Sequence, residues 1–314
     1  MSTALVAGAT GCVGAHVCAA FLDAGYRVVG LTRGVRPAGR PTDPDVLHHL
    51  DLVSCQPAEL AALLDDERVD VVVNATLAWG DDQSAMDRAN VTPVDTLLAA
   101  IAGSAAAPRL VQLGTVHEYG PVSPGTAIDE RVPPRPVNPY ARAKLAASER
   151  VLEAVRRDGL DAVVVRLANT VGPQPSMQTF FGTLAVSLAR LEAGSPPMPI
   201  TVADARRDYV DPRDAADAIV RAAGSRAADP LVNIGSGQAY DIRAMVGDLV
   251  AAAGLPPGVV EEQAGTVAGT VAGADWTLVD ATRARELLGW APRRSMPETL
   301  ADLYRSVAPA PTRG

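Results

Sequence analysis

Aromatic residues make up only 4% of the 314-residue sequence, and cysteine and histidine occur only three and four times. The cysteines, Cys12, Cys18 and Cys55, and the histidines show none of the spacings that are typical of metal ligands. A metal site is therefore not expected. An odd and sparse set of cysteines is typical of a reducing compartment, so we expect a cytoplasmic protein.

Long apolar runs and an excess of positive charge are also missing. No stretch approaches the roughly 18 continuous apolar residues of a membrane span. The chain begins with Ala4-Leu5-Val6-Ala7 rather than with the charged and apolar regions of a signal peptide, so no membrane partner is expected. The net charge of −8 disfavours nucleic acid as a partner. The composition is that of a soluble globular protein, and the length indicates two lobes.

The order of apolar and amphipathic segments predicts the fold. Short apolar stretches typical of buried parallel strands alternate with helix-favouring stretches over the first half of the chain. This alternation predicts an α/β fold with a Rossmann-type, doubly wound parallel sheet. The expected strands are 4–7, 27–31, 46–49, 69–75, 109–113 and 161–167, and the expected helices include 13–24, 83–101 and one that begins at Tyr140.

Beyond residue 169 the pattern is less regular and richer in proline, with a loop of small residues at 265–273. It predicts a smaller, partly interleaved α/β C-terminal domain that binds the substrate. The expected domains are a dinucleotide-binding domain at 1–168, which also receives about 207–234, and a substrate-binding domain formed by 169–206 and 235–314.

A glycine-rich turn lies between the first expected strand and the first expected helix. A dinucleotide site needs a tight turn, backbone N–H groups that approach a pyrophosphate closely, and a helix N-terminus directed at it. Strand, turn and helix occur here in that order, although the spacing is GxxGxxG rather than GxGxxG. The alternative is a glycine-rich turn without a ligand. The residues expected at the cofactor are Gly8, Thr10, Gly11, Cys12, Val13 and Gly14.

The end of the second expected strand bears on the choice of cofactor. A site that prefers NAD(H) places Asp or Glu there to bind the ribose 2′-hydroxyl, whereas this chain has Thr32-Arg33. A guanidinium suits a 2′-phosphate, so we expect NADP(H) rather than NAD(H). Alternatively, Arg33, Arg36 and Arg40 only solvate a loop rich in Pro and Gly. The other expected cofactor contacts are Asp51 and Leu52 at the adenine, Ala75 and Thr76 at the end of the fourth strand, and Asn90.

Tyr140 and Lys144 form a candidate catalytic pair. Asn138 is a good N-cap and Pro139 suits the first helical position, so a helix is expected to begin at Tyr140. The two side chains then lie one turn apart on one face of the helix. A nearby ammonium lowers the pKa of a phenol toward the value that an acid/base catalyst needs. The alternative is a half-buried ring beside a solvated charge.

These features occur together with several other motifs in a fixed order. The set resembles the extended short-chain dehydrogenase/reductases, the branch of NAD-dependent epimerases and dehydratases that act on nucleotide sugars. The resemblance covers essentially the whole chain. The residues that carry it are Gly8/Gly11/Gly14, Asn90, Thr115 with Tyr119-Gly120, Tyr140/Lys144, Arg166 with Asn169, Arg207-Asp208-Tyr209-Val210-Asp211 and Leu288-Gly289-Trp290-Ala291-Pro292.

The resemblance implies a role for each matching residue. Tyr140 is implied to be the acid/base, Lys144 to bind the nicotinamide ribose and lower the tyrosine pKa, and Thr115 to hydrogen-bond the reacting oxygen. Asn169 and Arg207 match positions that hold the diphosphate of the sugar nucleotide. The alternative for Arg207 is a surface ion pair with Asp208 or Asp211. A homodimer is also implied.

Departures from the family pattern narrow the expected reaction. The 4,6-dehydratases carry Asp-Glu, or at least Glu, directly after the catalytic Thr or Ser, whereas Val116 and His117 stand here. The epimerases keep NAD bound and carry an acidic residue after the second strand, where this chain has Arg33. The sequence therefore favours an NADPH-dependent reductase of a nucleotide-linked, dTDP-type 4-keto-6-deoxyhexose in a deoxysugar pathway of antibiotic-biosynthesis type. A 4-epimerase and a non-catalytic NADP(H) sensor are the alternatives.

Other residues are assigned with alternatives left open. His117 is expected to face the substrate, either as an auxiliary acid or as a loop histidine hydrogen-bonded to backbone. Trp79 and the pair Phe180-Phe181 line the sugar or base pocket, with Phe180 assigned to the substrate, or else they anchor the core.

Overall fold

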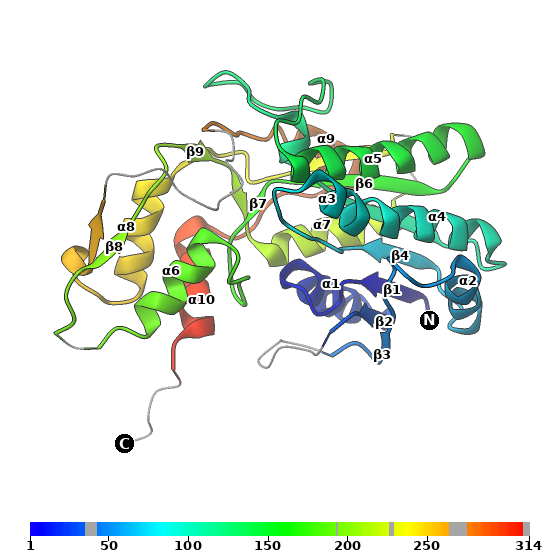
Figure 1. Cartoon of the computed structure of the whole chain (residues 1–314), viewed down its shortest axis with the longest axis horizontal. Helices are drawn as coiled ribbons and strands as arrows, with labels where there is room; N and C mark the ends of the chain where they lie inside the picture. The colour runs from blue at the N-terminus through cyan, green and yellow to red at the C-terminus, as the bar shows by residue number, and fades with distance from the viewer. Residues whose placement is uncertain (35–42, 193, 226–228, 264–274, 310–314) are drawn as a thin grey trace.

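The main body of the protein is a single parallel sheet. The computed structural model describes residues 1–34, 43–192, 194–225, 229–263 and 275–309. Within these residues, seven strands form the sheet in the order β11-β6-β5-β4-β1-β2-β3 (Figure 1), which confirms the predicted Rossmann-type α/β fold. The strands are β1 (Thr3–Ala7), β2 (Arg27–Thr32), β3 (Val46–His49), β4 (Val71–Asn74), β5 (Arg109–Thr115), β6 (Ala162–Leu167) and β11 (Leu231–Ile234).

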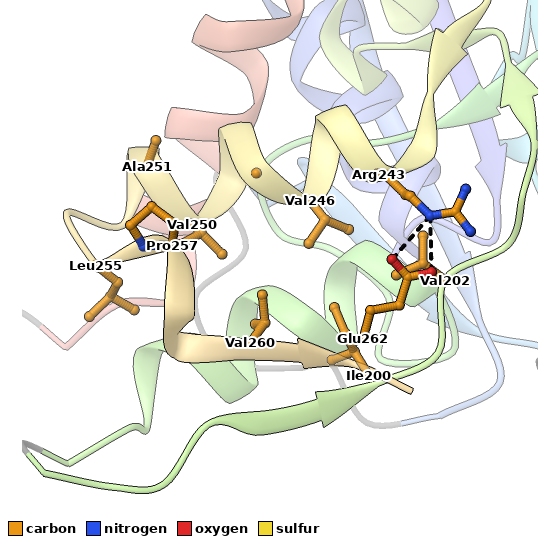
Figure 2. A pocket seen from close by; sticks show the side chains of 11 residues that line it. Ile200, Val202, Arg243, Val246, Val250, Ala251, Leu255, Pro257, Val260 and Glu262 are labelled. Carbon is orange, nitrogen blue, oxygen red and sulfur yellow. Dashed lines mark hydrogen bonds and ion pairs between the residues drawn. The ribbon is translucent and has the colours of Figure 1, made fainter. Parts of the chain in front are cut away.

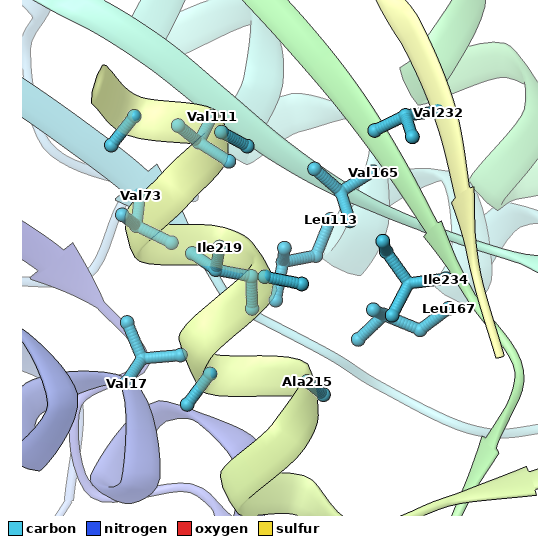
Figure 3. Close-up of a cluster of buried hydrophobic side chains, with 14 of the residues drawn as sticks. Val17, Val73, Val111, Leu113, Val165, Leu167, Ala215, Ile219, Val232 and Ile234 are labelled. Carbon is cyan, nitrogen blue, oxygen red and sulfur yellow. The ribbon is translucent and has the colours of Figure 1, made fainter. Parts of the chain in front are cut away.

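Helices cover both faces of the sheet. On one face, α1 (Cys12–Asp23) packs beside α7 (Pro212–Gly224), and α9 (Thr282–Leu288) continues this layer. Figure 3 shows Val17 of α1 and Ile219 of α7 in the cluster that covers this side of the sheet. Because both faces of the sheet are buried, its strands are continuous runs of apolar, mostly β-branched residues rather than alternating ones.

The opposite face is covered by α2 (Pro57–Asp66), α4 (Thr92–Gly103) and α5 (Pro139–Asp158). Leu64 and Leu97 pack there in a second buried cluster. The helix α2 was not predicted from the sequence.

The predicted single helix over 83–101 is wrong, because the structure divides it into α3 (Gln83–Asn90) and α4. Val91 lies between them and serves as a cap for both. Pro93, in the first turn of α4, has no N–H to donate to the preceding turn and its ring disfavours continuing α3. The break turns the chain after Asn90, and this residue then faces a loop that borders the site.

The second lobe is a smaller α/β body with its own core (Figure 1). Its helices α6 (Phe180–Ala189), α8 (Ile242–Ala252) and α10 (Met296–Val307) pack together, and β8 (Met198–Ile200) pairs with β13 (Val260–Glu262). The expected loop at 265–273 lies outside the described residues, and the proposed domain boundaries stay a prediction.

A small cavity of about 290 Å³ lies in the second lobe between α8 and the β8–β13 pair (Figure 2). Val246, Val250 and Val260 line it, and an ion pair joins Arg243 Nε to Glu262 Oε1 at 2.9 Å. None of the residues that line it also lines the larger cavity described below.

Short strand pairs connect the two lobes. Here β7 (Asn169–Thr170) pairs with β10 (Tyr209–Val210), and β9 (Arg206–Arg207) pairs with β12 (Tyr240–Asp241). The chain therefore crosses between lobes at Asn169 and Arg207, beside the carboxyl end of β6. None of the helices in the described part of the chain is long and apolar enough to cross a membrane.

The order in which the chain adds strands to the sheet reverses between β1 and β4. From β1 the chain passes through α1 to β2 on one side, whereas β4 lies on the other side of β1. In open α/β sheets, ligands bind in the crevice outside the carboxyl ends of the strands at such a switch point.

Candidate active site

A cavity of about 1090 Å³ opens at the carboxyl ends of the strands and extends to the second lobe. This volume is at the upper end of the range for small-molecule sites. Most of the residues that the sequence analysis singled out line it. They are Gly8, Thr10, Gly11, Cys12, Val13, Arg33, Asp51, Leu52, Ala75, Thr76, Thr115, His117, Tyr140, Lys144, Asn169, Phe180 and Arg207. Gly14 and Asn90 do not.

The glycine turn brings three backbone segments very close together. Gly8 has a φ of +81°, and a Cβ there would lie 2.8 Å from the carbonyl oxygen of Ala75 at the end of β4. A Cβ on Gly14 would lie 2.1 Å from the carbonyl oxygen of Gly8, so only glycine lets α1 start this close to the turn. Gly14 thus acts through packing rather than as part of the cavity wall.

The N-terminus of α1 is suited to an anion. Gly11 is the N-cap residue, and within the described residues no side chain caps the first turn of this helix. Cys12 and Val13 of that turn line the cavity, and the backbone N–H groups at a helix N-terminus point outward along the helix axis. The arrangement fits the pyrophosphate of a dinucleotide.

Asn90 supports the cavity from behind. Its side-chain oxygen accepts a hydrogen bond from the backbone N–H of Ala78 at 3.2 Å, and its amide donates to the carbonyl oxygens of Ala78 and Met86 at 3.3 and 3.0 Å. Because Asn90 does not line the cavity, its expected direct contact with the cofactor stays a prediction. This buried side chain holds the loop between β4 and α3.

Arg33 follows β2 at the far end of the cavity. Its side chain is exposed, and the hydroxyls of Thr10 and Thr32 lie 2.9 Å apart beside it. Asp51 lines the same end and accepts a hydrogen bond from the N–H of Val53 at 3.1 Å. One guanidinium, one carboxylate and two hydroxyl groups thus lie at this end of the cavity; Arg36 and Arg40 are outside the described residues.

Thr115, Tyr140 and Lys144 meet at the centre of the cavity, although the first two are 25 residues apart in the sequence. Thr115 ends β5, and Tyr140 lies in the first turn of α5, which is capped by Asn138 as predicted. The side chains of Thr115 and Tyr140 form a hydrogen bond. Lys144 Nζ donates to the carbonyl oxygen of Leu113 at 2.7 Å.

The pKa of Tyr140 moves opposite to the prediction. Burial raises the pKa of this phenol above its ordinary value, the hydrogen bond with Thr115 opposes that rise, and the charge of Glu118 adds to it. The expected lowering by Lys144 fails because the buried ring is desolvated, while the amine is hydrogen-bonded to β5. Burial likewise lowers the pKa of Lys144 to about 8, with Glu118 opposing this change.

Glu118 is a residue whose role the sequence analysis missed. It lies in the turn η1 (Val116–Tyr119), is fully buried, and does not line the cavity. Its carboxylate accepts hydrogen bonds from the N–H of Thr115, from Ser148 Oγ and from Arg166 Nε, at 2.8, 3.0 and 2.7 Å. Because Arg166 is 48 residues away, only the folded chain reveals the pair. Glu118 therefore holds Thr115 in place.

His117, Asn169 and Arg207 form the polar side of the cavity. His117 Nε2 lies 3.1 Å from Asn169 Oδ1, so the imidazole bonds to a side chain and not to backbone as one alternative expected. Burial lowers the pKa of His117 to about 4; the bond to Asn169 opposes this and the charge of Arg207 adds to it. His117 is thus neutral near pH 7.

Asp208 and Asp211, the two acidic residues of the surface ion-pair alternative for Arg207, have partners of their own. The carboxylate of Asp208 is buried and accepts N–H bonds from Ser236, Gly237 and Val279, while Asp211 binds Arg213. Arg207 lines the cavity beside Tyr209, and its role stays a prediction.

The aromatic residues divide between wall and core. Trp79 lines the cavity and stacks on Tyr140, with ring centroids 3.8 Å apart and planes 28° apart. Phe180 lines the cavity and packs edge to face on Phe181, which in turn packs on Tyr209 in the core of the second lobe. Both alternatives apply to Phe181, which belongs to this core and also lines the cavity.

The low pKa of His117 makes stability depend on pH. A histidine whose pKa is about 4 in the folded state and 6.5 when unfolded stabilises the protein fully above pH 6.5 and loses that contribution as the pH falls toward 4. Between pH 7 and pH 5, the wild type should lose about 2 kcal/mol more free energy of unfolding than His117→Gln. Urea unfolding at the two pH values measures this. His49→Gln, at an exposed position, should behave as wild type; equal losses in all three proteins would contradict the prediction.

A glycine turn under a free helix N-terminus and a Tyr–Thr–Lys site in one cavity define an NAD(P)-dependent oxidoreductase of the short-chain dehydrogenase/reductase class. A sequence model of the NAD dependent epimerase/dehydratase family matches residues 4–235. The chain belongs to this family. Within the described residues there is no group of three or more His, Cys, Asp or Glu side chains that could hold a metal ion.

Two curated relatives match nearly the whole chain. A dTDP-6-deoxy-L-talose 4-dehydrogenase (NAD(P)(+)) of Kitasatospora kifunensis is 39% identical over 309 residues, which cover 98% of this chain and 96% of the relative. A UDP-glucose 4-epimerase of Azospirillum brasilense is 30% identical over 319 residues, covering 92% of this chain and 87% of the relative.

Solved structures show the same fold. The structure of RMD from Pseudomonas aeruginosa complexed with NADPH superposes with a TM-score of 0.80 at 23% identity, covering 98% of this chain and 99% of the other. A dTDP-glucose 4,6-dehydratase from Bacillus anthracis in complex with NAD gives a TM-score of 0.83 at 18% identity, covering 98% and 96%. At these identities the likeness concerns the fold alone.

Proposed function

We propose that the protein is an NADPH-dependent reductase that converts the 4-keto group of a dTDP-linked 6-deoxyhexose to a hydroxyl. The relative from Kitasatospora kifunensis, named as a 4-dehydrogenase of such a sugar, supports this substrate class, since a dehydrogenase and a reductase catalyse one reaction in opposite directions.

The observation that carries the proposal is that, within the described residues, the three positions after Thr115 place no free carboxyl group in the cavity. Elimination of water, as in a dehydratase, needs an acid and a base at the sugar. Val116 is buried and His117 is neutral near pH 7, while Glu118 is turned away from the cavity and held by Arg166. A site with one phenol as its proton donor suits the reduction of a ketone.

In the proposed reaction, the glycine turn and Arg33 would hold NADPH, which would supply hydride for the C4 carbonyl carbon. Tyr140 gives its phenolic proton to the carbonyl oxygen as negative charge develops there, and the hydroxyl of Thr115 orients that oxygen. A buried phenol with a raised pKa is protonated near pH 7, which is the state that a proton donor needs. Lys144 lines the same cavity, where family resemblance assigns it to the nicotinamide ribose.

The proposal is tested by adding a dTDP-4-keto-6-deoxyhexose and NADPH to the purified protein. We expect NADPH to be consumed in step with formation of the 4-hydroxy sugar, followed by absorbance and product analysis. Tightly bound NAD with sugar conversion but no net redox change would support the epimerase alternative. The similarity to the 4-epimerase of Azospirillum brasilense favours this alternative. NADPH binding without turnover of any keto-sugar would leave the sensor alternative.

Arg33 is expected to select NADPH. In Arg33→Ala, we expect the Kd for NADPH to rise about 10- to 100-fold, because a charge-assisted contact to the 2′-phosphate is lost. The Kd for NADH should change less than about twofold. Fluorescence titration of both cofactors measures this. Arg131→Ala is the control, since that exposed guanidinium pairs with Asp129 and does not line the cavity; an equal loss for NADH and NADPH would contradict the assignment.

A further inference from the structure

The loop between β4 and α3 presents apolar side chains to the cavity. Leu77 and Trp79 are 45% and 37% exposed, and both line the cavity. A large indole left partly open is unusual in a chain with only 4% aromatic residues. Exposed apolar side chains gathered in a cleft are typical of a ligand contact.

Trp79 lies where the sugar must react. Its ring stacks on Tyr140 with centroids 3.8 Å apart, and it stands edge to face with His117 at 6.4 Å. The carbonyl oxygen of a substrate has to reach the phenol oxygen of Tyr140. The hexose that carries this carbonyl therefore comes to lie beside the indole.

The indole is held in place before any ligand arrives. Asn90 binds both the N–H and the carbonyl oxygen of Ala78, the residue directly before Trp79. At the start of the loop, Asn74 Oδ1 accepts hydrogen bonds from the N–H and the hydroxyl of Thr76, at 3.2 and 2.7 Å. A wall fixed by its own backbone contacts loses little entropy when a ligand binds.

The surroundings of Tyr140 are apolar on one side and polar on the other. Trp79 forms the apolar side, whereas His117, Asn169 and Arg207 carry hydrogen-bonding groups. A hexose with a C6 methyl group has an apolar edge in addition to its hydroxyl groups. A C6 hydroxyl directed at the indole face gains no hydrogen bond from it, whereas a C6 methyl group buries apolar surface there.

We propose that Trp79 is the residue that selects 6-deoxyhexoses, by contact of its indole with the C6 methyl edge of the sugar. This inference rests on the proposed function, because it assumes that Tyr140 reacts with a nucleotide-linked hexose. It assigns a specificity-determining role to Trp79, whereas Asn90 is a positioning residue for it.

The test compares two sugars that differ only at C6. Wild type, Trp79→Phe and Trp79→Ala are assayed in the oxidative direction with NADP+. One substrate is a dTDP-6-deoxyhexose that the wild type oxidises. The other is the dTDP-hexose of the same configuration that carries a C6 hydroxyl. We expect the wild type to favour the 6-deoxy sugar in kcat/KM by about 10- to 100-fold, the range that an apolar pocket achieves for such a difference. In Trp79→Ala the ratio should fall below about threefold, whereas Trp79→Phe should keep most of it.

The outcomes separate the two proposals. A ratio that stays unchanged in Trp79→Ala, or an equal loss of kcat/KM for both sugars, overturns the role of Trp79 while leaving the reductase in place. If Trp79→Ala fails to fold, Trp79→Phe is the deciding variant. The proposal is overturned if Trp79→Phe loses the preference for the 6-deoxy sugar although an aromatic ring is still present. It is supported if Trp79→Phe retains that preference. A wild type that turns over no nucleotide-linked sugar in either direction refutes the proposed function and the role of Trp79 with it.

Discussion

Tyr140→Phe should abolish nearly all turnover while leaving cofactor binding intact. The variant keeps the ring that stacks on Trp79 and loses only the hydroxyl that hydrogen-bonds Thr115. A positioned proton donor contributes about 10²- to 10⁴-fold to the rate, so we expect kcat for keto-sugar reduction to fall by that factor. Steady-state kinetics and an NADPH binding titration, done on one preparation, measure both effects.

Tyr119→Phe is the matched control for this experiment. Tyr119 is also buried, but its hydroxyl donates to Asn233 at 2.8 Å and it does not line the cavity. Removal of this hydroxyl should cost about 1 kcal/mol of stability and change kcat less than about threefold. If Tyr140→Phe retains more than about a tenth of wild-type turnover, Tyr140 is not the proton donor.

Glu118→Ala should lower the free energy of unfolding by about 3 to 5 kcal/mol, the largest stability change that we expect from one substitution here. The carboxylate is fully buried and pairs with Arg166, whose side chain is 3% exposed. Its loss leaves a buried guanidinium without its partner, and frees the N–H of Thr115 and the hydroxyl of Ser148. Denaturant unfolding monitored by fluorescence measures the change.

Two further variants test the cause of that loss. Glu153→Ala removes a carboxylate that is 44% exposed and pairs with Arg156, and it should change stability by less than about 1 kcal/mol. The double variant Glu118→Ala/Arg166→Leu removes both buried charges and should recover part of the stability lost in Glu118→Ala. A double variant less stable than the single one would show that Arg166 is not the source of the cost.

The predicted strands and the glycine turn agree closely with the folded protein. Strands buried on both faces need runs of apolar residues, and residues 4–7 and 162–165 have this local signature. The turn at Gly8 is equally local, since its positive φ suits only glycine. The start of α5 follows from Asn138 and Pro139 in the same way.

Other features depended on contacts that no local pattern encodes. The break at Val91 is an exception, because Pro93 is a local signal that the single predicted helix over 83–101 did not take into account. Asn90 was assigned to the cofactor by its position in a family motif, whereas its partner is the backbone of Ala78, 12 residues away. Glu118 pairs with Arg166, which lies 48 residues further along the chain.

The sequence by itself determined the class of fold, the glycine turn after β1, and the placement of Tyr140 and Lys144 one turn apart at the start of α5, because each depends on neighbours within a few residues. Only the tertiary structure decided that Tyr140 is so deeply buried that its pKa rises, that Lys144 binds the carbonyl of Leu113, and that Trp79 covers the phenol. Burial and electrostatic environment arise from elements distant in the chain, and they set the pKa of each group. The pair Tyr140 and Lys144 was thus recognisable in the sequence, but its chemistry was established by packing.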